Sequence, residues 1–285
     1  MTRRLAAALA LLLASTPAFA QRVDLRPRFE ESQEFKFLLR QTTLQKTYPK
    51  DKPDEAVTYE IRHEIDLAFT VVTPQEKNDR AATLEMRIEG LRFEMDTAGS
   101  KMSFDSAKPD ENGSLNHMLE PIIGAVFEIQ IDSDGNIISL ARQGQGSPSP
   151  FADQIIGTDI LSSRLGPILT LKKGDGRASV GEYWTTLDEF ENSPIGPHQL
   201  VTKHRLIKHR RRIAEIETTG RIIPKSEGAT FPLNFEYTGT YLWDTRQGML
   251  KSLEIESTLS TEIPGADGAA TTVETVSTLI VEQRE

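Results

Sequence analysis

The stretch VTYEIRHEIDLAFTV, residues 57–71, decides which fold class this chain can adopt. Every second side chain from Val57 to Val71 is apolar except His63, and most of the residues between them are charged or polar. This alternation predicts a β-strand with one buried face. At about 3.3 Å per residue the strand is roughly 46 Å long, so its sheet has to twist and bend. We therefore expect a mainly β (α+β) fold built on a large curved antiparallel sheet or partial barrel.

The next segment, residues 82–95, has the same alternation with one change of phase. Its apolar positions run from Ala82 to Ile88 on even numbers and from Leu91 onward on odd numbers. A β-bulge shifts the alternation by one residue and bends the strand. The sequence therefore predicts a bulge at Glu89–Gly90.

The stretch DSDGNIISL, residues 132–140, resembles half of a calcium-binding loop. Such a loop needs glycine at its sixth position and glutamate at its twelfth, where this chain has Ile137 and Gln143. Short alternating apolar runs flank the stretch on both sides. We interpret it as a β-hairpin turn in which Gly135 supplies a positive φ, and we expect no metal site.

The second part of the chain repeats this scheme. It predicts a hairpin over about 199–223 that turns near His209–Arg211, another that turns at 244–248, and a last strand over 271–281. Short similar segments occur in the same order in both parts, as a duplicated β unit would give. We therefore expect one β-rich domain over residues 21–285, with weakly similar halves at about 30–147 and 178–285.

Two segments carry helical patterns. Residues 114–124 place apolar side chains on one side, although Pro121 should kink or shorten the helix. Residues 151–165 are less regular and lie within a helical linker, 148–177. We expect both segments to pack on the concave side of the sheet.

The first twenty residues, MTRRLAAALALLLASTPAFA, have the three regions of a secretory signal peptide. We expect cleavage after Ala20 and export to a bacterial periplasm or to the exterior. The chain has no cysteine, which rules out disulfides and lipid attachment through a thiol. No later segment reaches membrane-spanning length, so no transmembrane segment is expected after cleavage.

Charge and motifs exclude several function classes. The net charge of −9 argues against nucleic acid as a partner. We find no nucleophile elbow, zinc-protease motif, phosphate-binding loop or dinucleotide fingerprint, so no cofactor and no catalytic residue is predicted. His204 and His209 are separated by an odd number of positions, which would place them on opposite faces of a strand and argues against a shared metal ion.

The order of these elements resembles a family of secreted bacterial β-rich proteins without an assigned function. The resemblance rests on the signal peptide, the strand with Gln33–Lys36, the long hairpin, the 127–140 hairpin and the segment Val180–Trp184. More distantly, a curved sheet plugged by helices is similar to periplasmic lipoprotein carriers and lipid-binding lipoproteins. That resemblance implies an apolar pocket between sheet and helices. The chain departs from lipid-anchored members because no cysteine stands at the cleavage site.

We expect a non-catalytic protein that binds a lipid-like, apolar or amphipathic ligand in the concave face of the sheet. An envelope scaffold or protein-interaction module without a small ligand is the alternative, and an unrecognised hydrolase is a remote one. A void between sheet and helices would favour the carrier, and solid packing the scaffold. His63 either contacts ligand or finds a hydrogen-bond partner in the core. The candidate ligand-binding residues are His63, Phe69, Phe93, Met118, Phe235, Tyr237 and Trp243.

The segment KHRLIKHRRR, residues 203–212, is basic in an acidic chain. We place its centre at a hairpin tip. It is either a solvated turn that protects a sheet edge or a docking site for an anionic envelope component such as phosphate-bearing lipid. Arg210, Arg211 and Arg212 are the candidate docking residues, because guanidinium groups bind phosphate in a bidentate manner.

Overall fold

A computed structural model describes the chain from residue 22 to residue 284 with internal gaps. The described ranges are 22–73, 82–97, 99–108, 113, 115–132, 136–144, 150–171, 174–190, 197–225, 233–264 and 270–284. The leader with its predicted cleavage site after Ala20, and Gly135 in the predicted hairpin turn, lie outside them.

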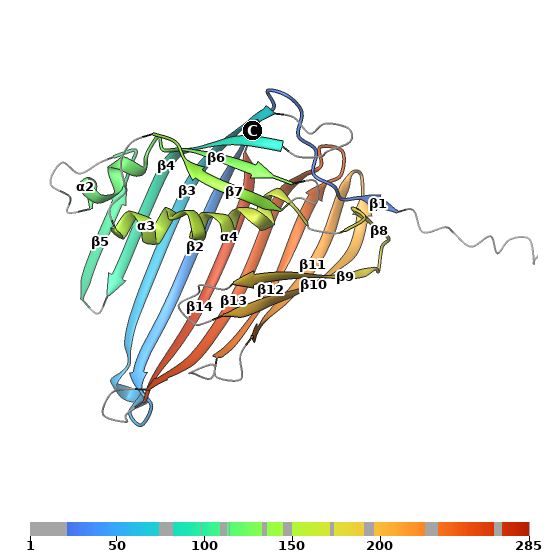
Figure 1. Cartoon of the computed structure of the whole chain (residues 1–285). Coiled ribbons are helices and arrows are strands. Elements are labelled where there is room, and N and C mark those ends of the chain that lie inside the picture. Colours follow the sequence, from blue (N-terminus) through green and yellow to red (C-terminus); the bar gives the residue numbers. More distant parts are fainter. Residues whose placement is uncertain are drawn as a thin grey trace, which may run out of the picture.

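Most of the described chain forms one antiparallel sheet of twelve strands that does not close into a barrel. Its strands curve around two short helices (Figure 1). This confirms the expected mainly β fold with a large curved sheet. The strands are β2 (Glu34–Pro49), β3 (Val57–Thr73), β4 (Ala82–Thr97), β5 (Ser100–Asp105), β6 (Val126–Ile131), β7 (Ile137–Arg142), β9 (Tyr183–Phe190), β10 (His198–Arg210), β11 (Ile213–Pro224), β12 (Leu233–Asp244), β13 (Met249–Pro264) and β14 (Ala270–Arg284).

The long alternating segment over residues 57–71 lies in β3, which pairs with β2 on one side and β4 on the other. Its inner face is buried from His63 to Val71. The predicted bulge is present, because Asp66 pairs with Gly90 and Leu67 pairs with Ile88, which leaves Glu89 without a direct partner strand residue. A Cβ at Gly90 would lie 3.0 Å from Oδ2 of Asp66, so a larger residue there would require the Asp66 carboxylate to shift.

The order of strands across the sheet is β7-β6-β4-β3-β2-β14-β13-β12-β11-β10-β9, with β5 paired to β4. Each half of the chain therefore forms a meander, and the two meanders join where β2 pairs with β14 in the middle of the sheet. Both meanders run in the same direction across the sheet. This topology is compatible with the proposed internal duplication, which stays a prediction.

The segment between the two meanders has to connect opposite edges of the sheet, and it does so through α3 (Pro150–Ile156) and α4 (Thr158–Leu169). Both helices cross the concave face in front of β2 and β3 (Figure 1). Gly157 separates them. The other predicted helix is short: α2 (Asn116–Leu119) is followed by η2 (Glu120–Ile122), a 3-10 turn that contains Pro121.

The N-terminal segment closes one end of the core. Residues 23–24 form β1 (Val23–Asp24), which pairs with β8 (Arg177–Ala178) in a separate two-stranded sheet. Leu25 and Phe29 then enter the hydrophobic core with exposures of 2% and 5%. One further 3-10 turn, η1 (Pro53–Glu55), lies between β2 and β3.

The hairpins β6–β7 and β10–β11 are present where the sequence predicted them. In the β6–β7 hairpin, the backbone N–H of Asn136 donates to Oδ1 of Asp132 at 2.8 Å and the Asn136 amide donates to Oδ2 at 2.9 Å. The β10–β11 turn consists of Arg211 and Arg212, whose φ values are 53° and 86°. Positive φ is unusual for arginine, so the surrounding contacts have to hold this turn in place.

Candidate functional site

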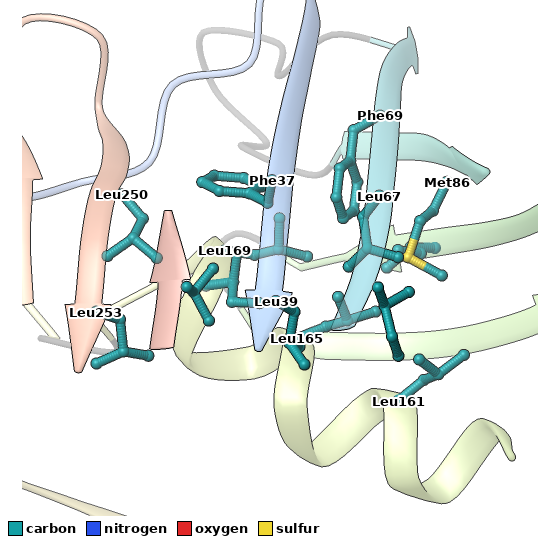
Figure 2. Close-up of a cluster of buried hydrophobic side chains, with 14 of the residues drawn as sticks. Phe37, Leu39, Leu67, Phe69, Met86, Leu161, Leu165, Leu169, Leu250 and Leu253 are labelled. Atoms are coloured by element: carbon teal, nitrogen blue, oxygen red, sulfur yellow. The ribbon is translucent and has the colours of Figure 1, made fainter. Parts of the chain in front are cut away.

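The inner, concave face of the sheet consists of two halves with different surroundings. In the first, which we call the packed half, α4 lies against the strands and its apolar side chains Leu161, Leu165 and Leu169 point at the sheet (Figure 2). All three are at most 3% exposed. The sheet residues drawn against them are Phe37, Leu39, Leu67, Phe69, Met86, Leu250 and Leu253.

The second half of this face, the open half, lies where β2, β3, β13 and β14 continue past the two helices (Figure 1). Alternation places the same face of each strand inward there, but the side chains are half-buried instead of buried. Many are still apolar. The half-buried apolar and aromatic side chains of the open half are Tyr59, Ile61, Met95, Met102, Leu233, Phe235, Tyr237, Ile255, Leu259 and Leu279.

A polar seam divides the open half along β2 and β14. The amide of Gln41 donates to Oγ of Ser277 at 3.0 Å and to Oγ1 of Thr43 at 3.3 Å. The two hydroxyls are themselves 3.0 Å apart. The open half therefore offers apolar surface on both sides of a line of hydroxyl and amide groups, which suits an amphipathic ligand.

Two of the predicted ligand residues, Phe235 and Tyr237, lie together on β12 in the open half, with ring centroids 6.1 Å apart. The Tyr237 hydroxyl hydrogen-bonds to the Thr202 hydroxyl on β10. To reach it, the ring crosses Gly220 of β11, where a Cβ would lie 1.8 Å from the ring. Burial raises the pKa of Tyr237. Because Gly220 has no side chain, the Tyr237 ring has the space to lie over β11 and reach Thr202.

Beside this aromatic pair, His204 of β10 is buried against Trp184 of β9, with stacked rings 5.1 Å apart. Its Nε2 is 3.2 Å from the hydroxyl of Thr186, while its buried Nδ1 has no hydrogen-bond partner within the described ranges. Burial lowers the pKa of His204 to about 4. The side chain is therefore neutral at physiological pH.

The expectation that His204 and His209 lie on opposite faces is wrong. A register shift between Leu206 and Lys208 brings His209 opposite Ala214, a buried inner-face residue. A bulge of this kind moves the following residues to the other face. His209 Nε2 is 3.3 Å from the hydroxyl of Thr245. Among the described residues no group of three histidine or acidic side chains is placed to hold a metal ion.

His63, the exception in the apolar face of β3, lies at the boundary between the two halves. It is 9% exposed, and it pairs across the sheet with Gln41 and Phe93. Its Nε2 has no hydrogen-bond partner in the part of the chain that the structure describes. Burial, together with the charge of Arg164 on α4, lowers the pKa of His63 to about 3. A purely structural role for His63 predicted a hydrogen-bond partner in the core. No described residue is such a partner for Nε2.

Arg164 is the site residue that the sequence pattern did not reveal. Its guanidinium donates to the backbone carbonyl of Ile155 at 3.1 Å, and burial lowers its pKa to about 10. No described carboxylate forms an ion pair with it. Its position in α4, three residues after buried Leu161 and four before buried Ile168, is the signal that could have identified it, because i, i+3 and i, i+4 neighbours share one side of a helix.

The remaining predicted ligand residues lie elsewhere. Phe69 stacks on Phe35 with centroids 5.0 Å apart, and Phe93 contacts Phe151 of α3 edge-on at 5.5 Å. Trp243 is 0% exposed. These three belong to the packed core. Met118 of α2 is partly buried against that core, and α2 lies near β5 at one edge of the sheet (Figure 1). The structure therefore does not bring the seven predicted residues together.

The three candidate docking arginines lie at or beside the tip of the β10–β11 hairpin, but this tip is the end of the segment 203–212 and not its centre, because residues 203–210 belong to β10. The three side chains also differ in surroundings. Arg210 and Arg211 are exposed, and no ion pair is described for either. The Nε of Arg212 instead lies 3.1 Å from Oδ2 of Asp244, a buried carboxylate in the next turn. Arg212 therefore has a structural partner.

No helix in the described ranges is long and apolar enough to cross a membrane.

A known structure shares the fold at low sequence identity. The protein in the structure "Lipid-protein interactions in lipovitellin" matches with a TM-score of 0.53 and 10% identity, over 89% of this chain and 25% of that one. This chain thus spans about a quarter of the length of that protein. The transport unit of the autotransporter AIDA-I from Escherichia coli gives a TM-score of 0.21 at 8% identity over 97% of both chains, which carries no argument about the fold.

Sequence comparison adds a short match. No curated protein matches the chain. A family of unknown function, DUF6263, matches residues 79–142, the segment that includes β4 through β7. Over that segment, whose described part lies at one edge of the large sheet, the chain is similar to a family whose function is not assigned.

Proposed function

We propose that this protein is an exported, non-catalytic protein that binds an apolar or amphipathic, lipid-like molecule in the open half of its concave face. The observation that carries the proposal is the set of half-buried apolar side chains where the strands extend past α3 and α4. Contiguous apolar surface of this kind is costly to leave in water, and it marks binding sites in many proteins. The signal-peptide pattern in residues 1–20 supports export.

The shape of the site supports a ligand that is not fully enclosed. Apolar side chains flank the polar seam formed by Gln41, Thr43 and Ser277. An amphipathic molecule could lay its chain on the apolar flanks and direct polar atoms at the seam. Met95 and Met102 pair across β4 and β5, and methionine adapts to irregular ligand shapes.

The lipovitellin likeness concerns the fold alone. Lipid–protein interactions are described for that protein, and a related use of a curved sheet is part of our proposal for this one. A shared fold does not by itself assign a ligand, so the support for lipid binding comes from the side chains of the open half.

The alternative, a scaffold without a small ligand, draws support from the packed half. Phe69, Phe93 and Trp243, which would have lined a void between sheet and helices, are all buried at 3% exposure or less. Because these side chains are buried, our proposal assigns the ligand to the open half. If the open half stays empty in the cell, the scaffold function is the better explanation.

Native mass spectrometry and lipid extraction of protein purified from its own host test the proposal. We expect a co-purified lipid-like molecule, and we expect Phe235→Ser and Leu259→Ser together to remove most of it. The matched control is Leu44→Ser with Val276→Ser. These two residues pair with each other on the convex face and are 45% and 50% exposed.

Two results would contradict the proposal. Bare polypeptide in native spectra, together with no uptake of the neutral fluorescent probe N-phenyl-1-naphthylamine, would favour the scaffold. Turnover in a screen of esterase, phosphatase and glycosidase substrates would favour the hydrolase.

A further inference from the structure

We propose that Arg164 and His63 form the anion-recognition site of this protein, which binds the carboxylate of a long-chain amphipathic acid whose chain lies in the open half. This inference rests on the proposed function and specifies the chemical class of its ligand. It requires a partly buried cation without a counter-ion, a second polar group beside it, and apolar surface that leads away from both.

The first requirement is met by Arg164. A guanidinium has five N–H donors, and only the bond to the Ile155 carbonyl is made within the described residues. Withdrawing a charge from water without pairing it is unfavourable, so proteins keep such groups mainly where a ligand or partner completes them. An opposing carboxylate would raise the pKa of this arginine, whereas burial lowers it to about 10.

The second requirement is met by His63. The side chain is only 9% exposed, and no described residue forms a hydrogen bond with its Nε2. Arg164 belongs to α4, which crosses the concave face of the sheet that carries His63 (Figure 1). The charge of Arg164 also lowers the pKa of His63. In the tautomer that carries the proton on Nε2, this nitrogen can donate a hydrogen bond to the same anion. The ligand would thus satisfy an orphaned donor and an unpaired cation together.

The third requirement is met by the strand positions next to His63. Ile61 lies two residues from His63 on the same face of β3, and it pairs with Met95 of β4. Met95 in turn pairs with Met102 of β5. All three are half-buried. Alternation therefore gives an apolar row directly beside the proposed carboxylate site, on the side away from α4.

Carboxylate is favoured over other anions by the small number of donors. One guanidinium and one imidazole match the two oxygens of a carboxylate. A phosphate monoester would bring more charge and more oxygens than these two groups can serve, since Gln41 already donates to Ser277 and Thr43.

The test compares dodecanoate with 1-dodecanol, which has the same chain and no charge, by displacement of N-phenyl-1-naphthylamine from the full-length mature protein. We expect dodecanoate to bind more tightly, and Arg164→Gln to weaken dodecanoate binding by about 10- to 100-fold while dodecanol binding is unchanged. His63→Phe should weaken dodecanoate binding by about 5- to 10-fold. The control is Arg62→Gln, which removes an exposed arginine next to His63 that pairs with Glu60.

The outcomes separate this inference from the proposed function. If Arg164→Gln binds both compounds as the unmodified protein does, the anion site is refuted and the apolar site stands. If neither dodecanoate nor dodecanol displaces the probe from the unmodified protein, both the anion site and the proposed function are refuted. A second measurement uses only the unmodified protein, so it does not depend on whether the variants fold. The carboxyl pKa of ¹³C-labelled dodecanoate should fall on binding, and an unchanged or raised value would refute the site.

Discussion

The Nε of Arg212 lies 3.1 Å from Oδ2 of Asp244, whose side chain is only 2% exposed. The other carboxylate oxygen accepts backbone N–H groups of Arg246 and Gln247 at 2.9 and 3.1 Å. The carbonyl of Arg212 accepts the N–H of Thr245 at 2.8 Å. Two neighbouring turns, β10–β11 and β12–β13, are therefore tied together by one buried carboxylate, which explains how Arg212 keeps a positive φ.

This pairing predicts unequal stability effects at the hairpin tip. Arg212→Gln should destabilise the protein by about 1–2 kcal/mol, because it leaves a buried carboxylate with one partner fewer. Arg210→Gln should change stability by less than about 0.5 kcal/mol, since that side chain is exposed. Urea unfolding of the two variants measures the difference, and equal midpoints would show that the ion pair contributes nothing.

The same pairing changes how docking to anionic membranes is tested. Arg210→Gln with Arg211→Gln, keeping Arg212, should abolish salt-sensitive sedimentation with anionic vesicles without loss of stability. The attraction acts over about 10 Å at ordinary salt, so the net acidity of the molecule does not cancel it. Neutral vesicles are the control. If the unmodified protein does not sediment at low salt, the hairpin is a solvated turn.

Aromatic residues of the two halves should respond differently to truncation. Trp243→Ala should cost about 3–5 kcal/mol, because a fully buried side chain leaves a cavity. Phe235→Ala should cost less than about 2 kcal/mol and should reduce uptake of N-phenyl-1-naphthylamine, because the ring is half-buried in the open half. Melting curves and probe titrations of both variants decide between core and ligand roles. A large loss of stability at Phe235 with normal uptake would remove it from the site.

Two buried histidines predict a loss of stability in mild acid. The pKa values of His63 and His204 are lowered to about 3 and about 4 in the folded protein, from 6.5 in the unfolded chain. Below pH 6.5 the unfolded chain takes up protons that the folded one does not, so stability falls until the pH reaches the folded values. Each histidine should contribute a loss of about 2–3 kcal/mol between neutral pH and about pH 4.5.

Urea midpoints over this pH range measure the effect. The double variant His63→Gln, His204→Gln should have a flatter profile, and His117→Gln on α2 serves as the control substitution. A double variant with the same slope as the unmodified protein would show that other groups cause the acid sensitivity.

Gly220→Ala should displace Tyr237. The added Cβ would lie 1.8 Å from the ring, so the ring has to move and its hydrogen bond to Thr202 is lost. We expect a loss of about 1–3 kcal/mol and weaker uptake of apolar probe. Gly174→Ala, where a Cβ meets nothing within 4 Å, should be neutral. Differential scanning calorimetry compares the two, and a stable Gly220→Ala with normal uptake would show that Gly220 does not orient the aromatic pair.

Local patterns explain why much of the fold was predictable. The alternation along residues 57–71 is a local property of β3, and the phase change at Glu89–Gly90 is a local property of β4. Both the long strand and the bulge could therefore be predicted from the sequence. The pairing of β2 with β14 has no such local signal, because residues far apart in sequence determine it.

The site was harder to predict. Phe69 and Phe235 occupy equivalent alternating positions, and only the helices that cover one and leave the other half-exposed distinguish them. Arg164 was missed for a related reason, since a single arginine in an irregular helical segment is normally solvated. Its surroundings depend on where α4 crosses the sheet.

The pairing of β2 with β14 has a consequence for how the chain reaches its native state. The centre of the sheet joins Lys36 to Arg284 and Pro49 to Thr271, so it cannot form until more than 230 further residues after β2 have been synthesised. Such non-local pairing slows folding. Until β14 arrives, β2 and β13 each present an unpaired edge, which is a template for aggregation. A chain of this topology therefore depends on the late pairing of β14 with β2, and a nascent chain that lacks β14 is the species most in need of a chaperone.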